Sequence, residues 1–386
     1  MAHFFRAPDR RQRFLLPVDM MDWLPEDDIV HLIVDAVGVM DLSEFEATCK
    51  VGHAGQPPFA PAMMLALLIY AYSHGVRSSR VIERLCRRDA GYRFIVGDEA
   101  PDHSVIARFR QRHAGRMKSV FLQVLELCRE AGLIRLGLVA LDGTKVKANA
   151  ALDANRAASS IEEQIGRMLA EAEAIDARED RQFGAASGGC ALPADLKRRG
   201  DRLVRLTACR EKLANRAAAN DVRQLTGMLN QAQANVAAVM GEDATLGAAV
   251  ADAGYWSEVN AESQTEECEL FIATQKDRKQ RAALREAPAP RGRMPRSMTA
   301  RERMERKLRT QRGRALYRRR GAAVEPMFGQ MKERQGADRF SMRGLERCRG
   351  EWQLDAAVHN LRKLHRDSVC HLRNQEKGGA KARKKA

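Results

Sequence analysis

Three short apolar runs, separated by long stretches of helical character, most constrain the fold of this chain. They are residues 137–141, 245–251 and 269–274. Short strands that alternate with helices predict an α/β core. The first two runs lead directly into Asp142 and Asp252, and open α/β sheets collect their ligands at the carboxyl ends of the strands. We therefore expect these two aspartates to lie at one functional edge of the sheet.

A helical module precedes the first strand and spans residues 1–135. Apolar side chains recur at helical spacing through it, and Asp102 is a good N-cap for a helix from His103 to His113. That helix carries Arg108 and Arg110, which could contact DNA or simply pack against neighbouring helices. The predicted helices are 26–40, 61–74, 78–88, 103–113 and 115–131.

The remaining chain divides into an interrupted core, an insertion and a tail. We predict the core from residues 136–152 and 241–366, with a last helix from Leu345 to His365. Residues 153–240 are rich in Ala, Glu and Arg, which predicts a helical insertion that includes a helix over 221–240. Residues 367–386 form a basic tail that we expect to be disordered.

Positive charge is concentrated in one part of the chain. The formal net charge is +16, and residues 276–320 contain 18 Lys and Arg against 4 Asp and Glu. Such an excess attracts polyanions, of which nucleic acid is the most obvious. A disordered, solubilising basic loop would explain the same composition, so charge alone does not decide between them.

Composition also indicates where the chain works. Its start lacks the apolar segment of a signal peptide, and its most apolar run, Ala62 to Tyr72, is too short to cross a bilayer. The eight cysteines are scattered and none forms a CxxC pair. We therefore expect a cytoplasmic protein with free thiols and no membrane partner.

A third acidic residue, Glu325, ends the basic stretch. Pro326 suits a first helical position, so we predict that Glu325 opens a helix on which Lys332 shares its face. Three carboxylates that converge with Asp142 and Asp252 would hold Mg²⁺, which prefers oxygen ligands. Each also has a structural explanation: Asp142 as part of a hairpin turn, Asp252 as a turn former, and Glu325 as an ion-pair partner of the arginines.

The sequence around these three acids resembles a known family. The segments LDGTKVKANA, ADAGYWSE and VEPMFGQMKE are similar to the three motifs of bacterial insertion-sequence transposases of the DDE class. Tyr317, Arg320, Glu325 and Lys332 resemble the Tyr-Arg-Glu-Lys signature of that class. Four residues separate Arg320 from Glu325, where the commoner pattern has three.

The resemblance implies a ribonuclease H-like catalytic core with a helical N-terminal domain and a helical insertion. It implies Mg²⁺-dependent cleavage and strand transfer of double-stranded DNA at the element's terminal inverted repeats, with a homodimer in the DNA complex. Two Mg²⁺ ions, with Mn²⁺ as a substitute, would be held by Asp142, Asp252 and Glu325. Tyr317, Arg320 and Lys332 would contact DNA phosphates.

One departure from the family pattern bears on activity. The family carries a strand pair between the helical insertion and the second aspartate, and no such pair is evident here. We hypothesise an internal deletion near Ala217–Asn220, which would remove the second and third strands of the ribonuclease H-like sheet and expose an edge of the first. The alternatives are therefore an inactive remnant that only binds DNA, or a metal-dependent nuclease that lacks strand transfer.

Overall fold

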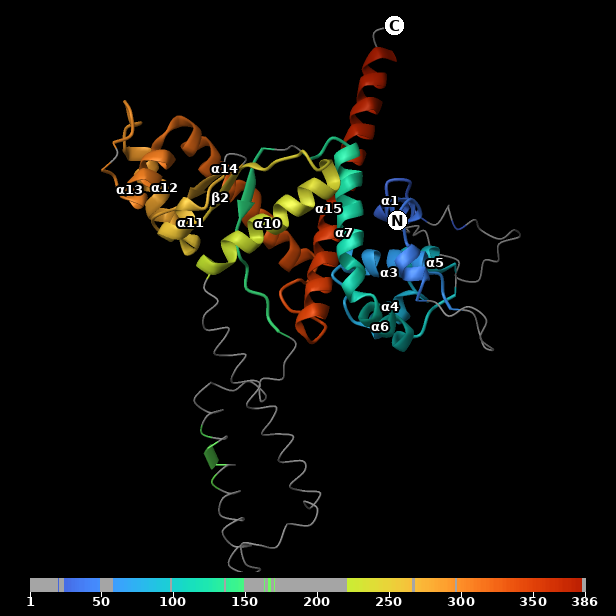
Figure 1. The fold of residues 1–386 in the computed structure, drawn as a ribbon. Coiled ribbons are helices and arrows are strands. Elements are labelled where there is room, and N and C mark those ends of the chain that lie inside the picture. The colour runs from blue at the N-terminus through green and yellow to red at the C-terminus, as the bar shows by residue number, and fades with distance from the viewer. Residues whose placement is uncertain are drawn as a thin grey trace, which may run out of the picture.

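The computed structural model describes residues 20, 24–48, 58–97, 99–134, 137–148, 221–265, 268–295 and 297–383, with single positions 163, 166, 167 and 170. These residues form two hydrophobic cores, one in a helical module and one around a small sheet. Figure 1 shows the module beside α7 and α15, and the sheet with its helices on the other side of α15.

The helical module is built around α3, whose residues from Met64 to Ser73 are all buried. A helix that is apolar on every side must be enclosed by others, and Pro61 at its start together with Gly75 just after its end sets its length. The predicted cap of α6 is confirmed, because Asp102 accepts from the backbone N–H of Ser104. The elements are α1 (Ile29–Gly38), α2 (Ser43–Glu46), α3 (Pro61–Ser73), α4 (Ser79–Leu85), α5 (Ala90–Val96), α6 (His103–Arg112), η2 (Ala114–Arg116) and α7 (Met117–Glu130).

The C-terminal helix α15 (Leu345–Arg383) completes the core of this module. Its buried residues Leu354, Val358 and Leu361 pack among side chains of α1, α3 and α7. This helix, which the sequence places in the catalytic core of residues 241–366, thus packs its apolar face in the N-terminal module. Residues 367–383 continue the helix, so the prediction of a disordered tail is wrong for them.

A buried ion cluster fastens α15 to the module. Arg77, which follows α3, donates to Glu351 at 3.0 Å and also binds Asp355, and both acids are about 1% exposed. Tyr72 donates to Glu351 at 3.2 Å, and the backbone N–H of Met342 does so at 3.1 Å. One arginine thus faces two buried carboxylates, and burial raises the pKa of Asp355 to about 7 despite the opposing charge of Arg77.

The sheet has three parallel strands in the order β1–β2–β3, namely β1 (Val139–Leu141), β2 (Gly247–Ala251) and β3 (Cys268–Ile272). The α-carbon of Leu141 is paired with that of Ala251. β2 and β3 are mostly buried, whereas Val139 and Ala140 of β1 are half-buried. Among the described residues β1 has a strand on one side only. The chain after Asp142 does not return as a hairpin, and Lys147 instead bridges to Arg339.

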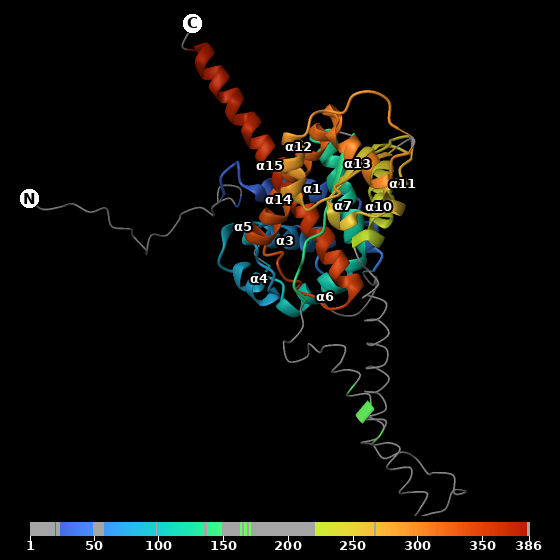
Figure 2. The same cartoon turned by 90° about the vertical axis from the view of Figure 1, so that its left-hand side faces the viewer.

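Helices surround this sheet. α10 and α14 contact β1, while α11 and α13 contact β3, and α10 also packs on α7 of the helical module. Helix α11 contacts both α10 and α13, and the three helices lie on the same side of the second view (Figure 2). The elements are α10 (Asp221–Met240), η4 (Ala253–Tyr255), α11 (Glu258–Glu262), α12 (Asp277–Glu286), α13 (Ala300–Arg309) and α14 (Gln311–Arg334).

Helix α14 corrects the prediction that Glu325 opens a helix. The helix begins fourteen positions earlier, where the Thr310 side chain accepts from the N–H of Gly313, and Pro326 lies inside it. Proline removes one backbone hydrogen bond and normally breaks a helix. Here the buried side chains of Tyr317, Arg320 and Val324 hold the preceding turns against the sheet, so tertiary contacts offset that cost.

Parts of the predicted organisation lie outside the described residues, including most of the insertion and the deletion near Ala217–Asn220. Of the insertion's predicted helices, the one over 221–240 is confirmed as α10. No helix in the described ranges is both long and apolar enough to cross a membrane.

The Asp355 cluster predicts a pH-dependent stability. The pKa of Asp355 is raised from 3.8 to about 7 in the folded chain, so its contribution is fully present below 3.8 and is lost as the pH rises through 7. In Asp355→Asn no group titrates at this position, so the free energy of unfolding does not fall there as the pH rises through 7. The free energy of unfolding of Asp355→Asn, relative to wild type, should therefore increase by on the order of a few kcal/mol between pH 4 and pH 8 in urea titrations.

The nearby His359 titrates in the opposite sense, because burial and the charges of Lys363, Arg362 and Arg366 lower its pKa to about 4. It is present in both proteins, so the difference between them isolates Asp355. Glu346→Gln, which removes an exposed acid of the same helix paired with Arg349, should show a much smaller trend. A flat difference for Asp355→Asn would contradict the assignment.

Candidate active site

The two strand-end aspartates lie side by side. Asp142 and Asp252 each follow a residue of the paired couple Leu141 and Ala251, and neighbouring strands are about 4.8 Å apart. Asp142 accepts from the N–H of Gly143 at 2.8 Å, and Asp252 accepts from that of Gly254 at 2.9 Å. Both are half-buried, so the sheet presents two carboxylates at one edge.

Arg320 of α14 joins this edge to α12. Its guanidinium is buried and donates from Nη1 to Asp142 Oδ2 at 3.0 Å and from Nη2 to Asp277 Oδ1 at 3.1 Å. Tyr317 donates its hydroxyl to the same Asp277 oxygen at 2.8 Å. The signature residues Tyr317 and Arg320 are each only 3% exposed, and they act inside the protein as a brace between sheet and helices.

Charge explains why this brace holds. Burial alone would raise the pKa of Asp277, but hydrogen bonds from Tyr317 and Arg320 and the charges of Arg281 and Arg320 lower it overall. Burial opposes the charge on Arg320 too, yet its acidic neighbours keep the pKa of Arg320 raised. The fork geometry of arginine suits two carboxylates at once.

Glu325 points away from the two aspartates. It is five positions after Arg320, which rotates it by about 140° around the helix. Its side chain is 59% exposed and accepts from Arg281 Nη2 at 3.1 Å, while Arg281 Nε binds Asp277 at 2.8 Å. A β-carbon on Gly321 would lie 2.5 Å from Arg281 Nη2, so the glycine leaves room for this guanidinium.

The carboxylates of Asp142, Asp252 and Glu325 are not gathered within 4.8 Å of one another. Only one group of three or more His, Cys, Asp or Glu ligand atoms within 4.8 Å of one another occurs in the described residues, and it is Glu83, Asp102 and His103. Asp142 and Asp252 are brought together, whereas Glu325 takes the ion-pair role that the sequence also allowed.

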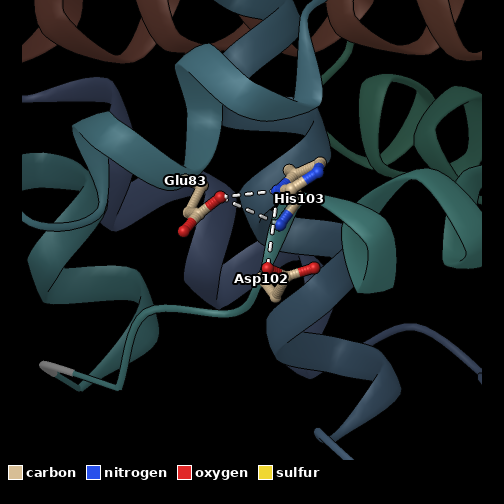
Figure 3. Close-up of side chains that lie close together, drawn as sticks. All are labelled: Glu83, Asp102 and His103. Carbon is tan, nitrogen blue, oxygen red and sulfur yellow. Dashed lines mark hydrogen bonds and ion pairs between the residues drawn. The ribbon is translucent and has the colours of Figure 1, made fainter.

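The Glu83 group has a structural explanation. Figure 3 shows Glu83 and Asp102 on either side of His103. Glu83 Oε2 accepts from the His103 backbone N–H at 3.2 Å and lies 2.9 Å from His103 Nδ1, and Glu83 Oε1 binds Arg87. Asp102 caps Ser104. These contacts tie α4 to the start of α6, and we assign no metal to them.

The remaining predicted DNA contacts divide by exposure. Arg110 is 8% exposed and donates to the carbonyl of Arg77 at 2.7 Å, so we revise it to a packing residue. Arg108 is exposed and, in the part of the chain that the structure describes, hydrogen-bonds to Ser104 of its own helix. Lys332 is half-buried, shares the helix face of Glu325 and has no ion pair among the described residues. Arg108 and Lys332 stay predicted DNA contacts.

Sequence reasoning missed Asp277 and Arg281. Both belong to α12 and are four positions apart, the spacing of a helical ion pair. Asp277 is one of only four acidic residues between Lys276 and Arg320, and an acid that rare in a basic stretch was the available signal.

Comparison with protein families agrees with this architecture. A transposase domain family, DUF772, matches residues 18–112, and the transposase DDE domain matches residues 261–365. The chain belongs to the DDE-class insertion-sequence transposases. The second match contains Tyr317, Arg320, Glu325 and Lys332 but begins after Asp252. A DDE domain implies a ribonuclease H-like fold, with which the small parallel sheet is consistent.

Neither a curated protein nor a solved structure matches this transposase. Its assignment therefore rests on the two family matches, which cover the helical module and the helices that carry the signature.

The contacts of Asp277 with Arg320, Tyr317 and Arg281 lead us to expect that Asp277 stabilises the fold. In Asp277→Asn the charge that faces Arg320, Arg281 and Tyr317 is lost, and Arg320 keeps only one anionic partner. We expect the free energy of unfolding to fall by about 1–3 kcal/mol, measured by chemical denaturation at neutral pH.

Glu346→Gln is the matched control, because it also removes one negative charge but from an exposed pair with Arg349. It should change stability by less than about 0.5 kcal/mol. Equal effects of the two substitutions would show that Asp277 is no more than a surface acid.

Proposed function

We propose that this transposase cleaves DNA strands at the ends of an insertion element and joins them to target DNA. Asp142, Asp252 and Glu325 would hold the divalent metal ions, two Mg²⁺ with Mn²⁺ as a substitute. The observation that carries this proposal is the pairing of Leu141 with Ala251, because it sets two carboxylates at the same end of adjacent strands, below a helix that bears the third.

The donor set fits such a cation chemically. Carboxylate oxygens are the ligands that Mg²⁺ prefers, and Asp142 and Asp252 are adjacent and half-buried. Glu325 fits in type but not yet in position, since its carboxylate faces Arg281. To complete the site, Glu325 would have to leave Arg281 and turn its exposed side chain toward the metal.

The chain's own groups orient the reaction. A bound divalent ion would supply Lewis-acid activation of the scissile phosphate and of the attacking hydroxyl. Asp277 holds Arg320 and Tyr317 from the side opposite the sheet. Asp277 would therefore keep Arg320 beside the ends of β1 and β2 when Asp142 binds a metal ion in place of Arg320. That role is positioning, which replaces the direct phosphate contact predicted for Tyr317 and Arg320.

DNA binding would involve the basic helices and the N-terminal module. Residues 276–320 carry most of the surplus charge and fold into α12, α13 and the start of α14, where Arg318 and Arg319 are exposed. Lys332 would add a point charge beside Glu325. A homodimer in the DNA complex would bring the two element ends together.

A second candidate function is DNA binding without catalysis. The position of Glu325 against Arg281 favours it, as does a sheet with only three strands among the described residues. Catalytic sites of this kind need their groups held within about 0.5 Å. A copy that cannot bring Glu325 to the aspartates would keep its basic surface and lose its chemistry.

A cleavage assay separates the two. Purified protein is incubated with duplex DNA that carries the element's inverted repeat, with Mg²⁺, Mn²⁺ or EDTA. We expect metal-dependent strand cleavage by wild type and a loss of at least about 100-fold in Asp252→Asn, because one ligand is removed.

Asp243→Asn is the control, since Asp243 is exposed in the loop before β2, and it should cleave as wild type does. If wild type and Asp252→Asn bind the duplex equally and neither cleaves it, the binding function is correct and the catalytic one is wrong.

A further inference from the structure

A basic cavity lies where the helical module meets the end of α14. Its volume is about 480 Å³, within the range of small-ligand sites. Its walls come from four parts of the chain: residues 25–29 at the start of α1, the end of α3, residues 330–335 of α14, and residues 359–366 of α15. The cavity therefore exists only when the N-terminal and C-terminal matched regions are assembled.

Cations outnumber acids in this cavity. Arg334, Arg362, Lys363 and Arg366 line it, against two carboxylates, Asp27 and Asp28. The Asp28 carboxylate is engaged in capping α1, where it accepts from the N–H of Val30 at 2.9 Å. The surplus is thus two positive charges on side chains gathered around one space.

The cations are not neutralised by ion pairs. Within the described ranges, no salt bridge forms at Arg334, Lys363 or Arg366. Arg362 donates to the carbonyl of Ser73, and its pKa is lowered by burial and by the charge of Arg334. Two guanidinium groups that repel each other across a cavity are the arrangement expected before an anion binds.

An unpartnered histidine supplies the second, independent observation. His359 is 3% exposed, lines the cavity, and its buried Nε2 has no hydrogen-bond partner among the described residues. Buried polar atoms are nearly always paired, and leaving one unpaired costs about 1–3 kcal/mol. Burial, with the charges of Lys363, Arg362 and Arg366, lowers the pKa of His359 to about 4, so the ring is neutral at pH 7, and in the tautomer that carries its proton on Nε2 this nitrogen donates to an anion.

We propose that this cavity is a phosphate-binding site, with Arg334 and Arg366 as its outer cations and His359 as its buried donor. Arginine and lysine bind phosphate oxygens through charge-assisted hydrogen bonds, and a tetrahedral oxyanion would satisfy Nε2 and the repelling guanidinium groups together. Asp27 and Asp28 partly offset the positive charge of the cavity, which favours an anion of low charge over a highly charged one.

The phosphate could come from a DNA backbone or from a free anion. Arg334 follows Glu325 by nine positions on α14, which places it about 13–14 Å along the axis and about 180° around it, so the two side chains lie on opposite faces of this helix. A DNA phosphate bound here would therefore belong to a segment that contacts the protein on a different face of α14 from the candidate active site. This DNA source rests on the function proposed above, whereas the phosphate site itself does not.

The test uses the full chain in EDTA, so that it is independent of catalysis. Inorganic phosphate is titrated while the ring resonances of isotope-labelled histidines are followed by NMR, and duplex DNA binding is followed by fluorescence anisotropy. We expect phosphate to shift the His359 resonances in wild type. In the double variant Arg334→Ala/Arg366→Ala that shift should be lost, and DNA affinity should fall about 10- to 100-fold at moderate salt.

Both substituted side chains are exposed and form no ion pair with any residue that the structure describes, so the variant should fold, which its thermal midpoint checks. Lys363→Gln provides a milder second variant, and Arg347→Ala, an exposed position on α15 away from the cavity, is the control. Loss of the phosphate response with unchanged DNA affinity identifies a free anion as the ligand and still supports the site. A His359 signal that ignores phosphate, together with unchanged DNA affinity in the double variant, would overturn the proposal.

Discussion

The buried guanidinium of Arg320 is the contact on which the candidate site depends. It reaches Asp142 at the end of β1 and Asp277 at the start of α12, and so joins the sheet to the basic helices through a single side chain. A buried cation with one partner removed is costly. The two carboxylates therefore secure the Tyr317–Arg320 turn of α14 against the edge of the sheet.

The basic segment, residues 276–320, is stabilised by ion pairs and a helix cap that its few acids form within it. Asp277 pairs with Arg281 and Arg320, Glu305 with Arg301, and Glu302 caps α13 through Thr299. Most of the arginines in this segment then remain on the surface. The sequence allowed either a disordered basic loop or a nucleic-acid surface, and the folded helices α12, α13 and α14 favour the second.

Local features were predictable, and partners were not. The strand ends, the cap at Asp102 and the stop at Gly75 follow from composition and short-range geometry, and the parallel pairing then brings Asp142 beside Asp252. Three features depend instead on contacts between residues far apart in the sequence. They are the course of α14 through Pro326, the burial of Arg110 and the packing of α15. Periodicity indicates that α15 has an apolar face, but it cannot say that the N-terminal helices, rather than the sheet, cover it.

The spacing between Arg320 and Glu325 determines the direction in which Glu325 projects from α14. With three intervening residues the two side chains would project within about 40° of each other, whereas four residues separate them by about 140°. Arg320 faces the core, so Glu325 must face outward, where Gly321 makes room for Arg281 to bind it. Rotating the whole helix to bring Glu325 inward would expose Arg320 and release Asp142. In the catalytic function proposed above, Glu325 would therefore have to reach the metal by a change of its own side chain, and Arg281 is the group that it would leave.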